Sequence, residues 1–362
     1  FIDTAGIDDT GALGELRIKK TRSIFNRTDL GIIVTEAESY GDFETKLILE
    51  LNERNIPLVI VFNKADLNAP EPKLRELLLQ QNIPCVSTVA VTNQGILDLR
   101  QALLDAVPPE MLQTPNLLGD IVGKGELVLI VVPTDKEAPK GRLIVPQQQT
   151  LRNLLDNDAL CMVAKEHELA TAFARLTQPP KLVITDSQAF KHVAAVTPPE
   201  VLLTSFSILF ARLQGDLTHM VKNTETISAL QTGDTILIAE ACTHHPIEDD
   251  IGREKIPNWL RRHTGSTLNF HHVQGHDFPD DLSEYKLIIH CGACMFNRRA
   301  MLTRLRACQT AGVPLTNYGL TIAYCLGIFE RALSPFPLAL KALTQHNNVS
   351  PKVKTPAVRN YA

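Results

Sequence analysis

The sequence predicts an α/β protein of three domains, each built on a mostly parallel sheet. Its 362 residues are too many for one ordinary hydrophobic core. Continuous β-branched runs alternate with stretches whose apolar residues recur at helical spacing, which is typical of strands buried between helices. Polar and sulfur-bearing residues follow several of these runs directly, where open α/β sheets usually place their sites.

The composition excludes several classes of protein. The net charge is −4 and no long Lys/Arg run occurs, so we expect no nucleic-acid partner. No run of about 18 apolar residues exists, so we expect no membrane span. The seven cysteines are scattered and odd in number, unlike a secreted disulfide framework. We therefore expect a cytoplasmic protein that uses some of its cysteines to bind metal.

The first predicted domain covers residues 1–115. Apolar strands are expected at 30–37 and 58–66, and helical spacing is found at 42–55 and 73–81. This alternation predicts a βαβ series and an open parallel sheet.

The second predicted domain covers residues 116–205, after a Pro- and Gly-rich segment at 107–125 that we interpret as a linker. Short strands are expected at 127–133, 161–164, 182–186 and 201–206. No constellation of polar residues accompanies them. A small α/β domain without a chemical site is often used for assembly, so we predict that it forms a homodimer.

The third predicted domain covers residues 206–337. We expect one long amphipathic helix over 205–223, and then strands that end in cysteines and histidines. Beyond it, 338–362 lacks periodicity and is predicted to be a flexible tail.

The chain opens with FIDTAG, in which Asp3-x-x-Gly6 ends an apolar run. P-loop nucleotidases use such a carboxylate to hold Mg²⁺, usually through water, and the glycine amide to approach the γ-phosphate. This motif alone is weak. Ile7 follows it where signalling GTPases often have a water-orienting Gln, which predicts slow GTP hydrolysis or a catalytic group supplied from elsewhere.

NKAD at 63–66 strengthens this interpretation. Asp66 would accept hydrogen bonds from guanine N1 and N2, Lys64 would cover the ring, and Asn63 would brace the loop. One αβ unit later, VSTVA places Ser87 and Thr88 where a Ser-led loop contacts the guanine O6. Three motifs in this order, each at a strand end, predict a GTP-binding domain with a P-loop GTPase fold.

The phosphate-binding motif G-x-x-x-x-G-K-[ST] does not occur in these 362 residues. The order of the other motifs predicts that the first strand, the P-loop and the first switch precede Phe1, through truncation or disorder. As given, the chain is expected to bind nucleotide poorly and to be inactive as a GTPase.

Two cysteine motifs follow apolar strands in the third domain. Cys242-x-His244 precedes Cys291-x-x-Cys294, with 46 residues between His244 and Cys291. Three thiolates and an imidazole could hold a tetrahedral zinc ion, and three cysteines could also hold a [4Fe–4S] cluster. Buried thiols without metal are a further alternative. A thioredoxin-like dithiol fits less well, since it would not need Cys242 and His244.

An Era-like GTPase domain, a middle domain, and C-x-H followed by H-C-x-x-C together resemble the HydF family of [FeFe]-hydrogenase maturation GTPases. The resemblance extends from Phe1 to about Pro337, and the combination of motifs is highly specific. It implies that Cys242, Cys291 and Cys294 ligate a [4Fe–4S] cluster. His244 matches the family's motif histidine, at a coordination position described as labile.

The resemblance also implies a role and partners. The protein would be a scaffold or carrier that assembles or delivers a transient di-iron subcluster precursor to apo-[FeFe]-hydrogenase. Separately, since GTP with Mg²⁺ can bias partner affinity by binding two states differently, we expect nucleotide to gate contacts with partners. The radical-SAM maturation enzymes would be further partners. The family's H-C-G-G-C is here altered to Gly292-Ala293, a mild change.

The other histidines and cysteines are expected to have structural roles only. His271, His272 and His290 are expected to be polar or surface residues, Asp250 to be solvated, and the other cysteines to pack as small apolar residues. The main alternative function is a GTP-dependent regulatory or metal-trafficking switch with a structural Cys₃His zinc site. An RNA-associated GTPase is a weaker alternative, because no basic stripe follows the GTPase motifs.

Overall fold

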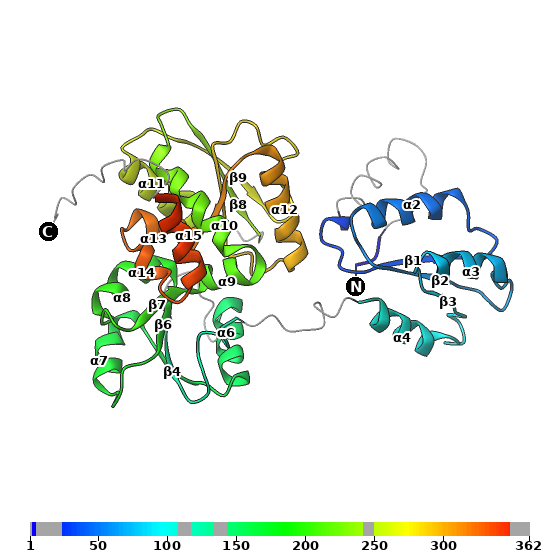
Figure 1. Ribbon diagram of the computed structural model, residues 1–362, viewed down its shortest axis with the longest axis horizontal. Helices are drawn as coiled ribbons and strands as arrows, with labels where there is room; N and C mark the ends of the chain where they lie inside the picture. Colours follow the sequence, from blue (N-terminus) through cyan, green and yellow to red (C-terminus); the bar gives the residue numbers. More distant parts are fainter. Residues whose placement is uncertain (1, 5–23, 108–116, 134–142, 242–249, 348–362) are drawn as a thin grey trace. The chain divides into compact units, whose positions relative to one another are not determined.

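The computed structural model describes residues 2–4, 24–107, 117–133, 143–241 and 250–347 (Figure 1). The chain divides into two compact units, Phe1–Pro115 and Asn116–Ala362. It contains three sheets, and all strand pairs within them are parallel among the described residues. The predicted α/β class with parallel sheets is confirmed.

The first unit is a three-stranded sheet in the order β1-β2-β3. Its strands and helices alternate along the chain: β1 Gly31–Thr35, α2 Asp42–Glu53, β2 Leu58–Phe62, α3 Pro72–Gln80, β3 Cys85–Ser87 and α4 Ile96–Ala106. Every residue of β2 is buried, as expected of the central strand of a sheet covered on both faces. Ile48 and Leu51 of α2 and Leu78 of α3 pack into this core at helical spacing.

The second unit contains two four-stranded sheets. The first has the order β5-β4-β6-β7. Its elements are β4 Leu127–Val131, α6 Val145–Asp156, β5 Leu160–Ala164, η1 Glu166–Glu168, α7 Leu169–Ala174, β6 Leu182–Thr185, η2 Ser187–Ala189, α8 Phe190–Val196 and β7 Leu202–Ser205. The central strands β4 and β6 are almost wholly apolar and buried.

The second sheet of this unit has the order β11-β10-β8-β9. Its elements are α9 Phe206–Gln214, α10 Leu217–Thr224, η3 Glu225–Ala229, β8 Thr235–Glu240, η4 Ile251–Lys255, α11 Ile256–Thr264, β9 Asn269–Gln274, β10 Leu287–His290, α12 Arg298–Ala311, β11 Leu315–Asn317, α13 Tyr318–Cys325, α14 Phe329–Ala332 and α15 Pro337–Asn347. Helix α9 contacts α6 and β7 of one sheet and α12, α13 and β11 of the other. One hydrophobic core therefore includes residues of both sheets.

The sequence predicted one helix over 205–223, and this is wrong. The structure breaks it into α9 and α10 at Gly215. A Cβ at Gly215 would lie 2.6 Å from the Met220 side chain, so the chain folds back closely there. Asp216 then caps α10, because its carboxylate accepts a hydrogen bond of 3.0 Å from the His219 amide.

Two boundaries also differ from the sequence prediction. The interpretation of 107–125 as a linker is wrong for its second part, since Leu117, Leu118 and Val122 are buried in the core of the second unit. The flexible tail predicted from residue 338 begins too early. Helix α15 packs against α10 and buries Ala339, Ala342 and Leu343.

Candidate functional site

The loops that carry the GTPase motifs meet at one edge of the first sheet. Because β1, β2 and β3 are parallel, their carboxyl ends lie side by side. The Asn63 amide donates to the carbonyl of Thr35 at 2.8 Å, and the Thr88 amide donates to the carbonyl of Phe62 at 2.9 Å. The sheet ladder thus fixes the start of both predicted guanine loops.

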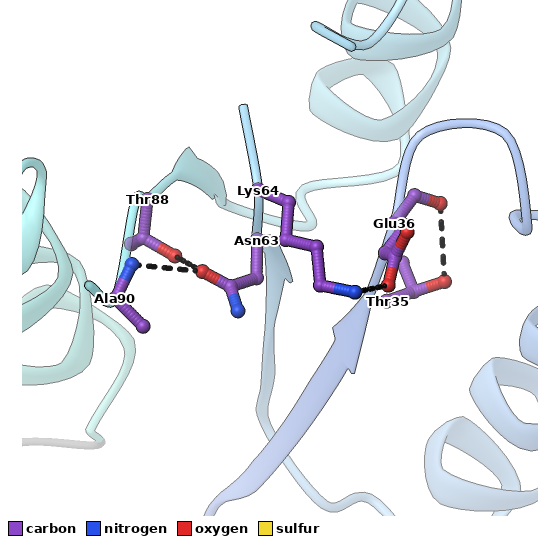
Figure 2. A network of polar contacts seen from close by, with 6 residues as sticks. All are labelled: Thr35, Glu36, Asn63, Lys64, Thr88 and Ala90. Atoms are coloured by element: carbon purple, nitrogen blue, oxygen red, sulfur yellow. Dashed lines mark hydrogen bonds and ion pairs between the residues drawn. The ribbon is translucent and has the colours of Figure 1, made fainter. Parts of the chain in front are cut away.

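Asn63 joins these two loops through its side chain. Its Oδ1 accepts hydrogen bonds from Thr88 Oγ1 and from the Ala90 amide, both at 3.1 Å (Figure 2). The Ala65 amide donates back to the carbonyl of Thr88 at 3.1 Å. The predicted guanine residues Asn63 and Thr88 are therefore in direct contact, although they are far apart in the sequence.

Lys64 and Asp66 are exposed at the same edge of the sheet. Lys64 has φ of 55°, a left-handed conformation, and its Nζ lies 2.6 Å from Glu36 Oε1 (Figure 2). Glu36 directly follows β1 and raises the pKa of Lys64 by hydrogen bonding to it. The Lys64 ammonium can therefore lie over the face of a planar base, and the Asp66 carboxylate can accept hydrogen bonds from the N–H groups at its edge.

The loop after β3 is held by a glycine. Ser87 Oγ accepts a hydrogen bond from Arg75. Gly95 has φ of 77°, and a Cβ there would lie 2.1 Å from the Ser87 carbonyl oxygen. Only glycine allows the backbone to pass this close, so Gly95 sets the position of the Ser87–Thr88 loop.

The γ-phosphate motif is described only in part. Asp3 is exposed and lies outside the strands that the structure describes. Gly6 and Ile7 lie outside the described residues.

The cysteine motifs belong to neighbouring strands of the second unit. Strands β8 and β10 pair in parallel, with His290 opposite Ala239. The ladder continues one residue further, where the Cys291 amide donates to the carbonyl of Ala239 at 2.9 Å. The Ala241 amide then donates to Cys291 Sγ at 3.1 Å. The end of β8 is therefore in contact with the Cys291 sulfur.

The Cys291–Cys294 loop wraps around that sulfur. The Ala293 amide also points at Cys291 Sγ, at 3.5 Å. Ala293 has φ of 54° and is buried, a conformation that glycine adopts more easily. Cys294 is half-buried, and burial raises the pKa of its thiol. The raised pKa favours the protonated thiol, and a bound metal would favour the thiolate.

Cys242 and His244 lie outside the described residues. In the sequence, Cys242 is nevertheless the next residue after Ala241, whose amide contacts Cys291 Sγ. Among the described residues no group of three or more potential metal ligands occurs. Two soft sulfur ligands and the amides aimed at Cys291 fit an iron–sulfur cluster or a zinc ion, since both take thiolates whose sulfurs accept amide hydrogen bonds.

Sequence reasoning missed a buried histidine–arginine pair behind Cys291. His290, predicted to be an ordinary polar or surface residue, is instead fully buried. Arg304 Nη1 donates to His290 Nε2 at 2.8 Å, and His290 Nδ1 lies 3.0 Å from the Cys291 carbonyl. Burial and the charge of Arg304 lower the pKa of His290 to about 3, so the ring is neutral at pH 7. The spacing of Met301, Arg304, Leu305 and Cys308 on one helical face is the signal that could have identified Arg304.

A second missed cluster lies at the end of β8. Glu240 is buried and accepts hydrogen bonds from Tyr318 Oη at 3.2 Å and Gln274 Nε2 at 3.0 Å. Asp250 is also buried rather than solvated as predicted, and it accepts from the Arg253 amide at 2.8 Å. Gly252 permits this packing, since a Cβ there would lie 2.2 Å from Tyr318 Oη.

Two family models match the second unit. The dimerization domain of hydrogen maturase F matches residues 117–215, and its tetramerization domain matches residues 218–335. The first match covers the sheet β5-β4-β6-β7, and the second covers the sheet with the cysteine motifs.

Curated relatives share a shorter region. The chain is 34% identical over 108 residues to the tRNA modification GTPase MnmE of Chromobacterium violaceum, covering 30% of this chain and 23% of that protein. It is 30% identical over 117 residues to MnmE of Acaryochloris marina, covering 32% and 25%. It is 36% identical over 108 residues to MnmE of Prochlorococcus marinus strain NATL2A, covering 29% of this chain and 23% of that protein.

The chain thus spans about a quarter of the length of these relatives. Likeness to GTPases agrees with the motifs and the parallel sheet of the first unit. The N-terminal part has the P-loop GTPase fold.

Gly95→Ala should destabilise the first unit by about 2 kcal/mol or more, because it adds a left-handed alanine and a clash with the Ser87 carbonyl. Hydrogen exchange of the β2 and β3 amides measures this loss. The matched control is Gly41→Ala, where a Cβ would meet nothing within 4 Å. Equal protection in the two variants would show that Gly95 does not hold the loop.

Proposed function

Because the chain belongs to the HydF family of hydrogen maturases, we propose that it is a GTPase and an iron–sulfur scaffold for hydrogenase maturation. In this proposal it assembles or delivers a di-iron precursor to apo-[FeFe]-hydrogenase, and the radical-SAM maturation enzymes are further partners. The observation that carries the proposal is the contact of the Ala241 amide with Cys291 Sγ. It brings the residue before Cys242 against the Cys291–Cys294 loop.

We assign Cys242, Cys291 and Cys294 as the ligands of a [4Fe–4S] cluster, with His244 at or near the remaining iron. When bound, a cluster held by three thiolates provides one iron with an exchangeable coordination position. The amides of Ala241 and Ala293 point at Cys291 Sγ, which stabilises negative charge on that sulfur. Glu240 and the β8–β10 ladder hold the two strand ends in place.

A zinc-bearing GTPase switch is the alternative. The same sulfur ligands could hold zinc, which would be colourless and stable in air. Measuring the zinc, iron and sulfide content of the purified protein distinguishes a zinc site from an iron–sulfur cluster.

Homodimerisation is proposed for the sheet β5-β4-β6-β7. Strand β5 lies at the edge of this sheet and pairs with β4 alone among the described strands. Leu160 and Val163 of β5 are 59% and 48% exposed. An edge strand with exposed apolar side chains is a ready surface for another chain.

We propose that nucleotide controls contacts with partners and takes no part in iron chemistry. Asn63, Lys64, Asp66, Ser87 and Thr88 form the guanine site in this proposal, and Asp3 and Gly6 with Mg²⁺ form the phosphate sensor. Nucleotide can shift partner affinity only by binding two states of the protein differently.

We propose a cytoplasmic location, because the six described cysteines are all free thiols. No described helix is long and apolar enough to cross a membrane.

The cluster assignment predicts that protein purified without oxygen holds about four irons and four sulfides per chain, with an EPR signal after reduction. Cys291→Ala should lose most of this iron. Cys308→Ala is the matched control, because Cys308 is buried in α12 and is not a proposed ligand. Stoichiometric zinc in place of iron and sulfide would overturn the scaffold proposal.

Charge on the β5 edge should prevent dimerisation. The double change Leu160→Lys and Val163→Lys should raise the dissociation constant at least about tenfold, since it places like charges across a paired edge. Light scattering over a dilution series measures this, with Leu97→Lys and Leu104→Lys on the exposed face of α4 as the control pair. An unchanged dissociation constant would place the dimer surface elsewhere.

Asp66→Asn should lower the affinity for GTP relative to that for xanthosine triphosphate by about 100-fold, because two hydrogen bonds to a charged acceptor are lost. An amide can instead donate to xanthine, so xanthosine triphosphate should bind better than GTP. Asp98→Asn, on exposed α4, serves as the control. Hydrogenase affinity is then compared with GTP, with its non-hydrolysable analogue and with none. Equal affinity in all three conditions would remove nucleotide gating.

A further inference from the structure

We propose that Arg304 is a positioning residue whose buried positive charge raises the reduction potential of the cluster on the Cys291–Cys294 loop. This inference rests on the proposed function, since it requires a cluster there. It assigns a role to a side chain outside the cysteine motifs.

Arg304 is held as a buried cation by carbonyl groups and aromatic rings. Its side chain comes from α12 and is 6% exposed. It donates to the Gly275 carbonyl at 2.7 Å and to the Asp277 carbonyl at 3.3 Å. Its guanidinium lies 4.7 Å from the centre of the Phe278 ring and 4.6 Å from that of Phe296. No ion pair to Arg304 occurs among the described carboxylates.

This arrangement stabilises the guanidinium but does not neutralise its positive charge. Carbonyl dipoles and ring faces stabilise a guanidinium, yet they leave its net charge in place. The Asp277 carboxylate interacts electrostatically with Arg304, but Asp277 is exposed and solvent weakens that interaction. The field of Arg304 therefore acts on its surroundings.

His290 connects this charge to the cysteine loop. An arginine can only donate, so His290 Nε2 accepts from Arg304 and the ring proton lies on Nδ1. Nδ1 then donates to the Cys291 carbonyl at 3.0 Å. The chain of contacts runs from α12 through a buried neutral ring to the backbone of a proposed ligand. It fixes the orientation of that peptide group and brings the positive charge behind the loop.

The direction of the effect follows from electrostatics. Reduction adds one electron and makes the cluster and its thiolates more negative. A fixed cation in a buried environment of low dielectric constant stabilises the reduced form more than the oxidised form. Removing the charge should make the reduction potential more negative. The carboxylate of Glu240 stays in place, so the difference between variants isolates Arg304.

The test is an EPR-monitored redox titration of the reconstituted full chain. Arg304→Gln keeps hydrogen-bond donors but loses the charge, and Arg304→Met is a second neutral variant that fills the space between the two rings. Arg304→Lys keeps the charge. Arg306→Gln is the matched control, because Arg306 lies on the exposed face of the same helix. Iron and sulfide are measured in every variant, and thermal unfolding confirms that each is folded.

At the wild-type midpoint potential, the ratio of reduced to oxidised cluster should fall about tenfold in the neutral variants, equivalent to about 59 mV for one electron. It should change less than about twofold in Arg304→Lys and Arg306→Gln. Full cluster content with an unchanged potential in the neutral variants would overturn the role of Arg304 alone, as would an equal shift in Arg304→Lys. A wild-type protein that binds zinc and no cluster would overturn the proposed function itself.

Discussion

The parallel pairing of β8 and β10 is the constraint on which the cysteine site depends. The register puts His290 opposite Ala239, and one further ladder bond joins the Cys291 amide to the Ala239 carbonyl. Successive residues of a strand point to opposite sides. Cys291 can therefore present its sulfur to the end of β8 while His290 is buried against Arg304. A shift by one residue would exchange these roles and place a histidine where the thiol is needed.

The second unit connects the proposed assembly surface to the cysteine site through one core. Helix α9 lies against both sheets, and Ser207 accepts hydrogen bonds from the Asn317 side chain at 2.9 Å and from the Gly319 amide at 3.1 Å. A Cβ at Gly319 would lie 2.9 Å from the Ser207 Cβ, so α9 and α13 meet with no room for a larger residue. Assembly through β5 would thus involve the same compact body as the cysteines, whereas the GTPase motifs belong to a separate one.

Two buried charged side chains near the cysteine loop have neutral hydrogen-bond partners. The Arg304 guanidinium is satisfied by carbonyls and rings, and the Glu240 carboxylate by a phenol and an amide. Buried charges of this kind are costly for stability. A protein that only needed a stable core would gain from apolar residues at both positions. Their presence beside proposed metal ligands is consistent with a site whose electrostatics are set by the protein.

The sequence by itself determined the α/β class, the parallel sheets and the family. Buried β-branched strands and helical spacing are local patterns, and NKAD or C-x-x-C are read directly. The break of the helix expected over 205–223 was missed although its signals are local, since Asp216 can cap a new helix and Met220, which packs on Gly215, is only five residues away. The sequence also predicted His290 to be an ordinary polar or surface residue and Asp250 to be solvated, whereas both are buried. Only the tertiary structure decided these environments. Burial of a polar side chain depends on partners far away in the sequence, such as Arg304 on α12 for His290, and no local pattern encodes that distance.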